Sequence, residues 1–401
     1  MCHPIEVVGI GADGWDGLPP ASRSVVDAAD VVFGSTRQLA SVPVSAERCR
    51  SWPSPLVPAL RSWMAEFDGR RICVLASGDP MFHGIGVTLA REFGAERLHV
   101  RPAPSSLSLA CARLGWAVST TPVVNLVNAP IATVLPALSN KTRLVVLSRD
   151  EHTPAVVTEL LRDNGYGRST VTVLEQLGGT AERLMNGVAE NWTHPPGDAL
   201  NVVAIDCVVD SESMRLGRLP GLPDAAFGGD GQLTKSEVRA LTLAALSPVP
   251  GELLWDVGGG SGSIAIEWMR TDPSCRATTF EVDADRRIQI EDNAVALGVP
   301  GLEVLGPAPQ SFPDSPSPDA VFIGGGLTQD GMVDACWHRL APGGRLTANA
   351  VTAESEAFLL QCVSMFGGSL RKFQIYRGEP LGAFTGWRPH LPVAQWSAVK
   401  P

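Results

Sequence analysis

The feature that most constrains the fold is an alternation of short apolar runs with helical patterns, which stops once and then resumes. Before residue 211, eight runs rich in Val, Ile and Leu indicate strands, and amphipathic segments lie between them. Strands separated by single helices need crossover connections, so we expect a largely parallel sheet here. The strands are predicted over 5–11, 30–34, 71–77, 98–102, 123–127, 143–148, 170–176 and 199–206, and the helices over 20–29, 85–93, 106–114 and 154–164.

A change in composition and periodicity divides the chain into two domains. Residues 211–232 are rich in Gly, Pro and small polar residues without periodicity, which is typical of an interdomain linker. We predict an α/β protein with domains at 1–210 and 233–401, the first bent into two lobes near 113–122. The second domain is predicted to have helices over 235–246, 263–269, 284–297, 329–340 and 353–366, and strands over 252–258, 277–283, 302–306, 319–325, 345–351 and 369–378.

Charge and composition exclude several classes of function. The 32 Lys and Arg against 42 Asp and Glu give a net charge of −10, which argues against nucleic acid or an anionic membrane as a partner. No run approaches the ~20 apolar residues that span a bilayer, and the N-terminus lacks a secretory pattern. The eight cysteines show no metal-ligand spacing. We therefore expect reduced cysteines, no metal site and a cytoplasmic protein.

The strongest local motif is a strand, LLWDV, that runs through GGGSG straight into a helix. Glycines let a backbone turn sharply near a ligand, and a helix N-terminus suits a polar or anionic group. Glu281 ends the next predicted strand, 25 residues after Asp256, where an acid can accept hydrogen bonds from both hydroxyls of a ribose. NAD and S-adenosylmethionine both fit this argument. The predicted cofactor residues are Gly258, Gly259, Gly260, Ser261, Gly262 and Glu281.

The first domain carries three turns, each at the predicted carboxyl end of a strand. Each turn alone has the residues of an ordinary structural turn. Together the three turns indicate a ligand crevice along one sheet edge. The residues predicted to line it are Gly9 and Gly11, Gly78 with Asp79 and Pro80, and Ser105 with Ser106. His83 follows the second turn, and its role as a site, surface or core residue stays open.

Both motif sets resemble known methyltransferases. The D-x-G-x-G-x-G spacing resembles the Rossmann-like class I methyltransferase loop better than the dinucleotide pattern G-x-G-x-x-G, and the ordered trio of turns resembles the tetrapyrrole (corrin/porphyrin) methylase family. The fusion of the two is similar to the decarboxylating precorrin C5,15-methyltransferases of cobalamin biosynthesis. Further segments that carry the resemblance are VVFGSTRQL (31–39), GGDGQLTKSEVRALTLAAL (228–246), PDAVFIGGG (318–326) and LTANAVT (346–352).

The resemblance implies a function for each domain. It implies S-adenosylmethionine sites in both, methylation at C5 by the first and at C15 by the second, and loss of carbon dioxide from the C12 acetate. It implies a tetrapyrrole (precorrin) substrate and a homo-oligomer, and it adds Thr234 and Ala308 to the cofactor residues. Many relatives read G-D-A-P where this chain has GPAP at 306–309, so adenine contacts there would fall to backbone atoms.

A substrate with many carboxylates requires local cations in an acidic protein. Lys235 and Arg239 lie four apart on one predicted helix and are candidate carboxylate clamps, with a solvated helix face as the alternative. Asn349 at a strand end is a further candidate substrate contact. No triad or other catalytic residue is indicated.

Two other functions stay open at this point. One is a cobalt-precorrin methyltransferase of the anaerobic route, which shares the cofactor chemistry. The other is a nucleotide-dependent oxidoreductase, or a non-catalytic nucleotide-binding protein, on the same folds. The D-x-G-x-G-x-G spacing argues against this last class.

Overall fold

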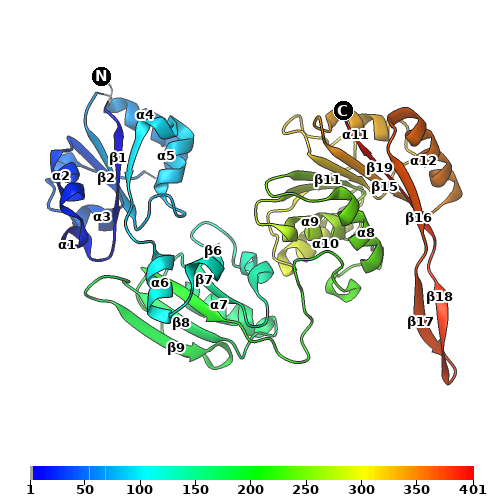
Figure 1. Ribbon diagram of the computed structural model, residues 1–401, viewed down its shortest axis with the longest axis horizontal. Coiled ribbons are helices and arrows are strands. Elements are labelled where there is room, and N and C mark those ends of the chain that lie inside the picture. Colours follow the sequence, from blue (N-terminus) through cyan, green and yellow to red (C-terminus); the bar gives the residue numbers. More distant parts are fainter. Residues whose placement is uncertain (1–2, 54, 68) are drawn as a thin grey trace. The chain divides into compact units, whose positions relative to one another are not determined.

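The computed structural model describes residues 3–53, 55–67 and 69–401, which divide into two compact units (Figure 1). Unit 1 comprises Met1–Ile131 and Ser139–Ser213, and unit 2 comprises Ala132–Leu138 and Met214–Pro401. Most of the segment predicted as a linker, 211–232, therefore counts with unit 2, where Leu222 is buried in the core. No described helix is long and apolar enough to cross a bilayer.

The first sheet of unit 1 is parallel in every pair, in the order β3-β2-β4-β1-β5. Its elements are β1 (Ile5–Ile10), α1 (Gly14–Gly17), α2 (Pro20–Ala28), β2 (Val31–Gly34), α3 (Thr36–Ala40), β3 (Cys49–Ser51), α4 (Leu56–Glu66), β4 (Ile72–Ser77), α5 (Ile85–Phe93) and β5 (Leu98–Arg101). The strands are continuous apolar runs because helices bury both faces. Leu60 of α4 and Leu89 of α5 cover one face, and Val26 of α2 covers the other.

The second sheet of unit 1 corrects the expectation of a largely parallel sheet. Its elements are α6 (Ser106–Leu114), β6 (Val123–Asn125), β7 (Arg143–Leu147), α7 (Thr153–Asp163), β8 (Thr170–Glu175), β9 (Arg183–Val188) and β10 (Asn201–Asp206). In the order β6-β7-β10-β8-β9 only β6 and β7 are parallel. Alternation in sequence shows where strands lie but not the direction in which each inserts. The unpredicted strand β9 is largely exposed, so it lacks an apolar run.

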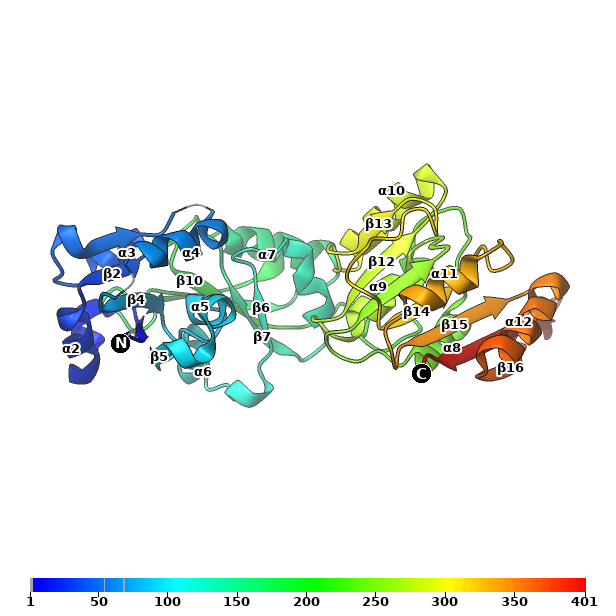
Figure 2. The ribbon, with the colours of Figure 1, turned by 90° about the horizontal axis from the view of Figure 1, so that it is seen from above.

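Unit 2 contains one seven-stranded sheet, in the order β13-β12-β11-β14-β15-β19-β16. Its elements are α8 (Ser236–Leu246), β11 (Leu253–Val257), α9 (Ser263–Thr271), β12 (Arg276–Phe280), α10 (Ala284–Ala296), β13 (Glu303–Leu305), β14 (Ala320–Ile323), α11 (Met332–Arg339), β15 (Arg345–Ala350), α12 (Ala353–Phe366), β16 (Ser369–Phe373) and β19 (Val393–Val399). The strands from β13 to β15 are parallel, and β19 is antiparallel to both neighbours (Figure 2). Helices α8, α9 and α10 pack on one face, and α11 and α12 on the other.

The end of unit 2 differs from the prediction. The single strand expected over 369–378 is divided between β16 and a further strand, and the two strands after it were not predicted. β19 is a buried run around Trp396. β17 (Tyr376–Leu381) and β18 (Phe384–Pro389) form an antiparallel arm that extends beyond the body of the unit (Figure 1). The arm exposes 79% of Phe384 and 76% of Trp387.

Candidate functional site

The glycine-rich loop after β11 passes through the carboxyl edge of the unit 2 sheet. Gly258 and Gly260 have φ angles of +79° and +57°, a region that favours glycine. A Cβ on Gly258 would lie 2.5 Å from the amide nitrogen of Gly325, which follows β14. The loop thus crosses the point between β11 and β14 where the strand order reverses. Open α/β sheets bind their ligands at such a point.

Glu281 joins this loop to the end of β12. Its side chain is buried, and Oε2 accepts a 2.8 Å hydrogen bond from the amide of Gly260. Oε1 accepts a 3.0 Å hydrogen bond from the amide of Asp283. A carboxylate offers about four acceptor positions, so capacity for hydroxyl donors remains after these two bonds. The predicted ribose acceptor and the predicted loop lie one hydrogen bond apart.

Asp256 is a buried acid of β11 that the predicted set left out. It is 1% exposed, and its Oδ2 accepts a 3.3 Å hydrogen bond from the amide of Ala265 in α9. Burial raises the pKa of this carboxyl to about 7, and the nearby carboxylate of Glu281 acts in the same direction. The sequence signal for a site residue here was an acid within an apolar strand. An ionisable group is rarely buried in such a strand unless it has a partner or a function.

Asn293 of α10 holds the loop from another side and was also missed. Its buried Nδ2 donates to the carbonyl oxygens of Ser261 at 2.9 Å and Gly228 at 3.1 Å. Its Oδ1 accepts from the Gly228 amide at 2.9 Å. The Ser261 hydroxyl is buried without a hydrogen-bond partner among the described residues. A single Asn within a helix gives no sequence signal for such a bridge.

The chain that leads into α8 runs along the same loop. A Cβ on Gly260 would lie 3.1 Å from the carbonyl oxygen of Gln232. Thr234 and Lys235, predicted to contact cofactor and substrate, follow two and three residues later and are partly buried. Ala308, on the segment after β13, packs against the core that contains Trp255 and Phe280.

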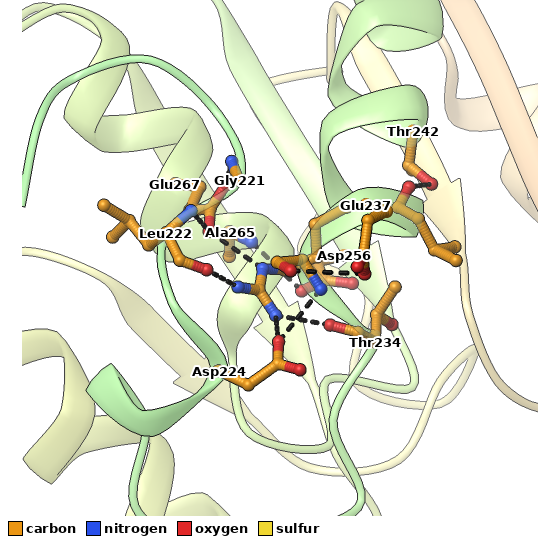
Figure 3. A network of polar contacts seen from close by, with 12 residues as sticks. Gly221, Leu222, Asp224, Thr234, Glu237, Thr242, Asp256, Ala265 and Glu267 are labelled. Carbon is orange, nitrogen blue, oxygen red and sulfur yellow. Dashed lines mark hydrogen bonds and ion pairs between the residues drawn. The ribbon is translucent and has the colours of Figure 1, made fainter. Parts of the chain in front are cut away.

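Arg239 is fully buried, which corrects its prediction as a substrate clamp. Its guanidinium forms ion pairs with Glu267 (Nε to Oε1, 2.8 Å) and Asp224 (Nη1 to Oδ1, 3.0 Å). It also donates to the carbonyl oxygens of Leu222 and Thr234 (Figure 3). Helix periodicity placed this residue correctly on α8 but could not show that the segment before the helix folds over it.

Asn349, a predicted substrate contact, is half-buried and forms hydrogen bonds within the fold. Its Nδ2 donates to Oγ1 of Thr242 at 2.9 Å, and its Oδ1 accepts from Nε2 of Gln395 at 2.8 Å. These bonds tie β15 to α8 and β19. The strand that supplies Gln395 was not predicted, so this partner could not be foreseen.

In unit 1, the predicted turns come together at the carboxyl edge of the first sheet. A Cβ on Gly9 would lie 2.1 Å from the carbonyl oxygen of Gly78 and 2.7 Å from the amide nitrogen of Ala103. The Ala103 amide donates to that same Gly78 oxygen at 3.3 Å. The ends of β1, β4 and β5 converge because β1 pairs with both neighbours.

Several polar groups of these turns stabilise the turns themselves. Oδ1 of Asp79 accepts from the Met81 amide at 2.9 Å, and Oγ of Ser105 caps α6 by accepting from the Ser108 amide at 3.1 Å. His83 is exposed at a φ of +53°. The other predicted residues in these turns are Gly11, Pro80 and Ser106.

Two side chains outside the predicted set meet at the end of β4. Nη2 of Arg37 and Nε2 of Gln38 both donate to Oγ of Ser77 at 3.1 Å. Gln38 also forms a capping box with Ser35 at the start of α3. Arg37 therefore places a cation beside the turn that begins at Gly78.

The described part of the chain contains no group of three or more His, Cys, Asp or Glu side chains that could hold a metal. Its seven cysteines, from Cys49 to Cys362, form no disulfides. Cys2 lies outside the described residues.

Comparisons with known proteins give two family matches. Residues 4–192 match the model described as tetrapyrrole (corrin/porphyrin) methylases, and residues 225–400 match the model described as a precorrin methyltransferase domain. Two curated relatives are named precorrin-6Y C(5,15)-methyltransferase [decarboxylating]. The relative from Mycobacterium tuberculosis (strain CDC 1551 / Oshkosh) is 50% identical over 401 residues, which cover 99% of this chain and 100% of the relative. The relative from Sinorhizobium sp is 45% identical over 399 residues, which cover 99% and 96%.

A solved structure is similar to part of the chain. The C-terminal domain of precorrin-6Y C5,15-methyltransferase from Rhodobacter capsulatus is 48% identical, with a TM-score of 0.44. The match covers 46% of this chain and 100% of that one.

Proposed function

We propose the reaction of this chain and the residues that serve it. The chain belongs to the family of decarboxylating precorrin-6Y C(5,15)-methyltransferases. The reaction is methylation of precorrin-6Y at C5 and C15 from S-adenosylmethionine with loss of carbon dioxide from the C12 acetate, to give precorrin-8X. The assignment rests on sequence identity to the curated relatives over 99% of the chain. The structural observation that carries it is the hydrogen bond from the Gly260 amide to Glu281. It places a buried carboxylate against a glycine-rich loop at the switch point of the sheet.

The residues of unit 2 fit S-adenosylmethionine. When bound, this cofactor supplies a sulfonium methyl group to a carbon nucleophile. The remaining acceptor capacity of Glu281 suits the ribose hydroxyls. The glycines at 258, 259, 260 and 262 carry no side chains, so a ligand can approach the backbone of the loop closely. Thr234 and Ala308 complete the proposed set.

A second cofactor site is proposed in unit 1. The close packing of Gly9 against Gly78 leaves backbone, rather than side chains, at the meeting point of β1, β4 and β5. Gly11, Asp79, Pro80, Ser105 and Ser106 belong to the same set. In this proposal each unit performs one methylation, C5 in unit 1 and C15 in unit 2.

The protein's part in both transfers is mainly orientation. An electron-rich macrocycle supplies the carbon nucleophile, so the site must align it with the methyl group and exclude water. No side chain is assigned as nucleophile or base. The decarboxylation requires an electron sink in the neighbouring ring system, and no acid is assigned to protonate it.

The sheet order argues against the oxidoreductase alternative. The common dinucleotide-binding order 3-2-1-4-5-6 has no strand between the fifth and sixth, whereas β19 lies antiparallel between β15 and β16. Calorimetric titration separates the two: S-adenosylhomocysteine should bind and NAD should not. Tight binding of NAD alone would overturn the proposal.

The decisive test of the reaction is mass spectrometry of precorrin-6Y incubated with the full chain and S-adenosylmethionine. The expected product has gained two methyl groups and lost one carboxyl group. A parallel incubation with the cobalt-containing precorrin addresses the anaerobic alternative. Conversion of the cobalt form alone would contradict a metal-free substrate.

The arm of unit 2 is proposed to mediate a homo-oligomer. Leu381, Phe384 and Trp387 are 67%, 79% and 76% exposed, and they gather large apolar groups on a two-stranded element. Exposed apolar surface of this kind marks protein–protein contact sites. A second copy of this chain offers the same surface and is the proposed occupant.

A further inference from the structure

We propose that a cavity at the base of the arm binds a carboxylate-bearing side chain of the tetrapyrrole substrate. The inference rests on the proposed function and adds a substrate subsite to it. The cavity is a shallow hollow of about 230 Å³, a volume that includes space open to solvent, and it lies between the start of α8 and the strand ends that lead to and from the arm. Its lining consists of Lys235, Glu237, Val238, Phe373, Ile375, His390, Leu391 and Val393.

Lys235 supplies a cation that the fold itself does not use. Unit 2 has three lysines: Lys372 pairs with Glu356 at 2.7 Å, and Lys400 donates to main-chain carbonyl oxygens. The ammonium of Lys235 has no ion pair or hydrogen bond within the described residues. Lys235 also occupies the N-cap of α8, where small polar side chains are preferred and a cation opposes the helix dipole. A bound anion would offset that unfavourable placement.

The acid in the same cavity is already neutralised. Glu237 accepts hydrogen bonds from Nε of Arg377 at 3.0 Å and from Nη2 at 2.6 Å. The same guanidinium contacts Asp224 at 3.3 Å, so both carboxylates are paired. Among the described residues that line the cavity, Lys235 therefore has no free carboxylate to compete with a bound anion.

The rest of the lining suits an amphipathic ligand. Phe373, Ile375 and Val393 add apolar side chains to the same lining as the cation. His390 adds a second polar group, and its main-chain amide donates to the Ile375 carbonyl at 2.8 Å, which fixes the position of its segment. A macrocycle with an apolar ring and carboxylate-tipped side chains matches this combination better than a small free anion does.

The cavity is also close to the proposed methyl-transfer site. Gln232 lies against the glycine loop at Gly260, and Lys235 follows three residues later. Three residues span at most about 11 Å even when fully extended. A tetrapyrrole can therefore place a ring carbon near the loop while one of its side chains reaches Lys235.

The test compares Lys235→Ala, Lys235→Arg and His390→Ala with Lys372→Ala as a matched control that removes an exposed, paired lysine. For C15 methylation by the full chain, we expect Lys235→Ala to raise KM for precorrin-6Y about tenfold. The affinity for S-adenosylhomocysteine should not change. Lys235→Arg should recover most of the loss, His390→Ala should raise KM less, and Lys372→Ala should behave as wild type.

The outcomes separate this inference from the function it rests on. Unchanged KM in both Lys235→Ala and His390→Ala, with C15 methylation intact, would overturn the subsite and leave the function standing. An equal loss of affinity for S-adenosylhomocysteine in Lys235→Ala would place the lysine in the cofactor site and also overturn it. Failure of the wild-type chain to bind S-adenosylhomocysteine at all would contradict the function itself.

Discussion

The amide of Gly260 and the carboxylate of Glu281 are joined by a 2.8 Å hydrogen bond that links the loop after β11 to the end of β12. The bond makes the loop conformation and the position of the acid depend on each other. A change at Glu281 should therefore disturb both parts of the proposed cofactor site of unit 2.

Glu281→Ala should weaken binding of S-adenosylhomocysteine to unit 2 by about 10- to 100-fold, because it removes the acceptor of the Gly260 and Asp283 amides and the proposed ribose contact. C15 methylation should fall while C5 methylation persists, as measured by mass spectrometry of the product. Parallel loss of both methylations would show that the two sites are not independent.

Gly9→Ala should abolish C5 methylation and leave C15 methylation. The added Cβ would lie 2.1 Å from the carbonyl oxygen of Gly78 and must push the turn after β4 away from β1. Gly167→Ala is the matched control in unit 1, since its Cβ would meet the nearest atom, Cβ of Glu190, at an ordinary 3.4 Å. Equal loss of C5 methylation in both variants would point to general damage to unit 1.

Arg239→Met should destabilise unit 2 by about 3–5 kcal/mol, because it leaves the buried carboxylate of Glu267 without its cation. Unfolding in urea, followed by a probe specific to unit 2, measures the effect. The exposed pair of Arg388 and Glu379 is the control, and Arg388→Met should change stability by less than about 1 kcal/mol. Similar losses in the two variants would contradict a structural role for Arg239.

Asp256 should make unit 2 less stable as the pH rises. Its pKa is about 7 in the folded protein against an ordinary value of 3.8, so the folded state binds the proton more tightly. The stabilisation is complete below pH 3.8 and is lost as the pH rises to about 7. Between pH 5.5 and 7.5 the group should account for a loss of about 2 kcal/mol.

Asp256→Asn should remove this contribution, so the variant should lose about 2 kcal/mol less than wild type over that rise in pH. Denaturant unfolding at both values measures the difference. An identical pH dependence in the two proteins would mean that Asp256 does not titrate in this range.

Replacing Phe384 and Trp387 by Ser should lower the assembly state of the chain, because it removes the largest exposed apolar groups of the arm. Sedimentation equilibrium measures the mass. Both residues are exposed and lie outside the cores, so the melting temperature of dilute protein should change little. An unchanged mass would exclude the arm as the contact.

Several site residues could be predicted from the sequence because each occupies a position defined by its own strand. Glu281 was predicted from its place at a strand end, and the structure brings it to the predicted loop. Asn293 could not be predicted, because its role depends on Ser261 and Gly228, which lie 32 and 65 residues away. The prediction that Arg239 contacts the substrate was wrong, because a charged residue on an amphipathic helix normally faces water and Arg239 is buried.

The sequence by itself determined the alternation of strands and helices, the two α/β units, the glycine loop and the likeness to both methyltransferase families. These features follow from local periodicity and from short motifs within one strand–turn–helix unit. Only the tertiary structure decided the strand directions in the second sheet of unit 1, the insertion of β19 and the burial of Arg239. It also placed Lys235 in the lining of the cavity at the base of the arm. Such features depend on contacts between residues far apart in the chain, which a local pattern cannot specify.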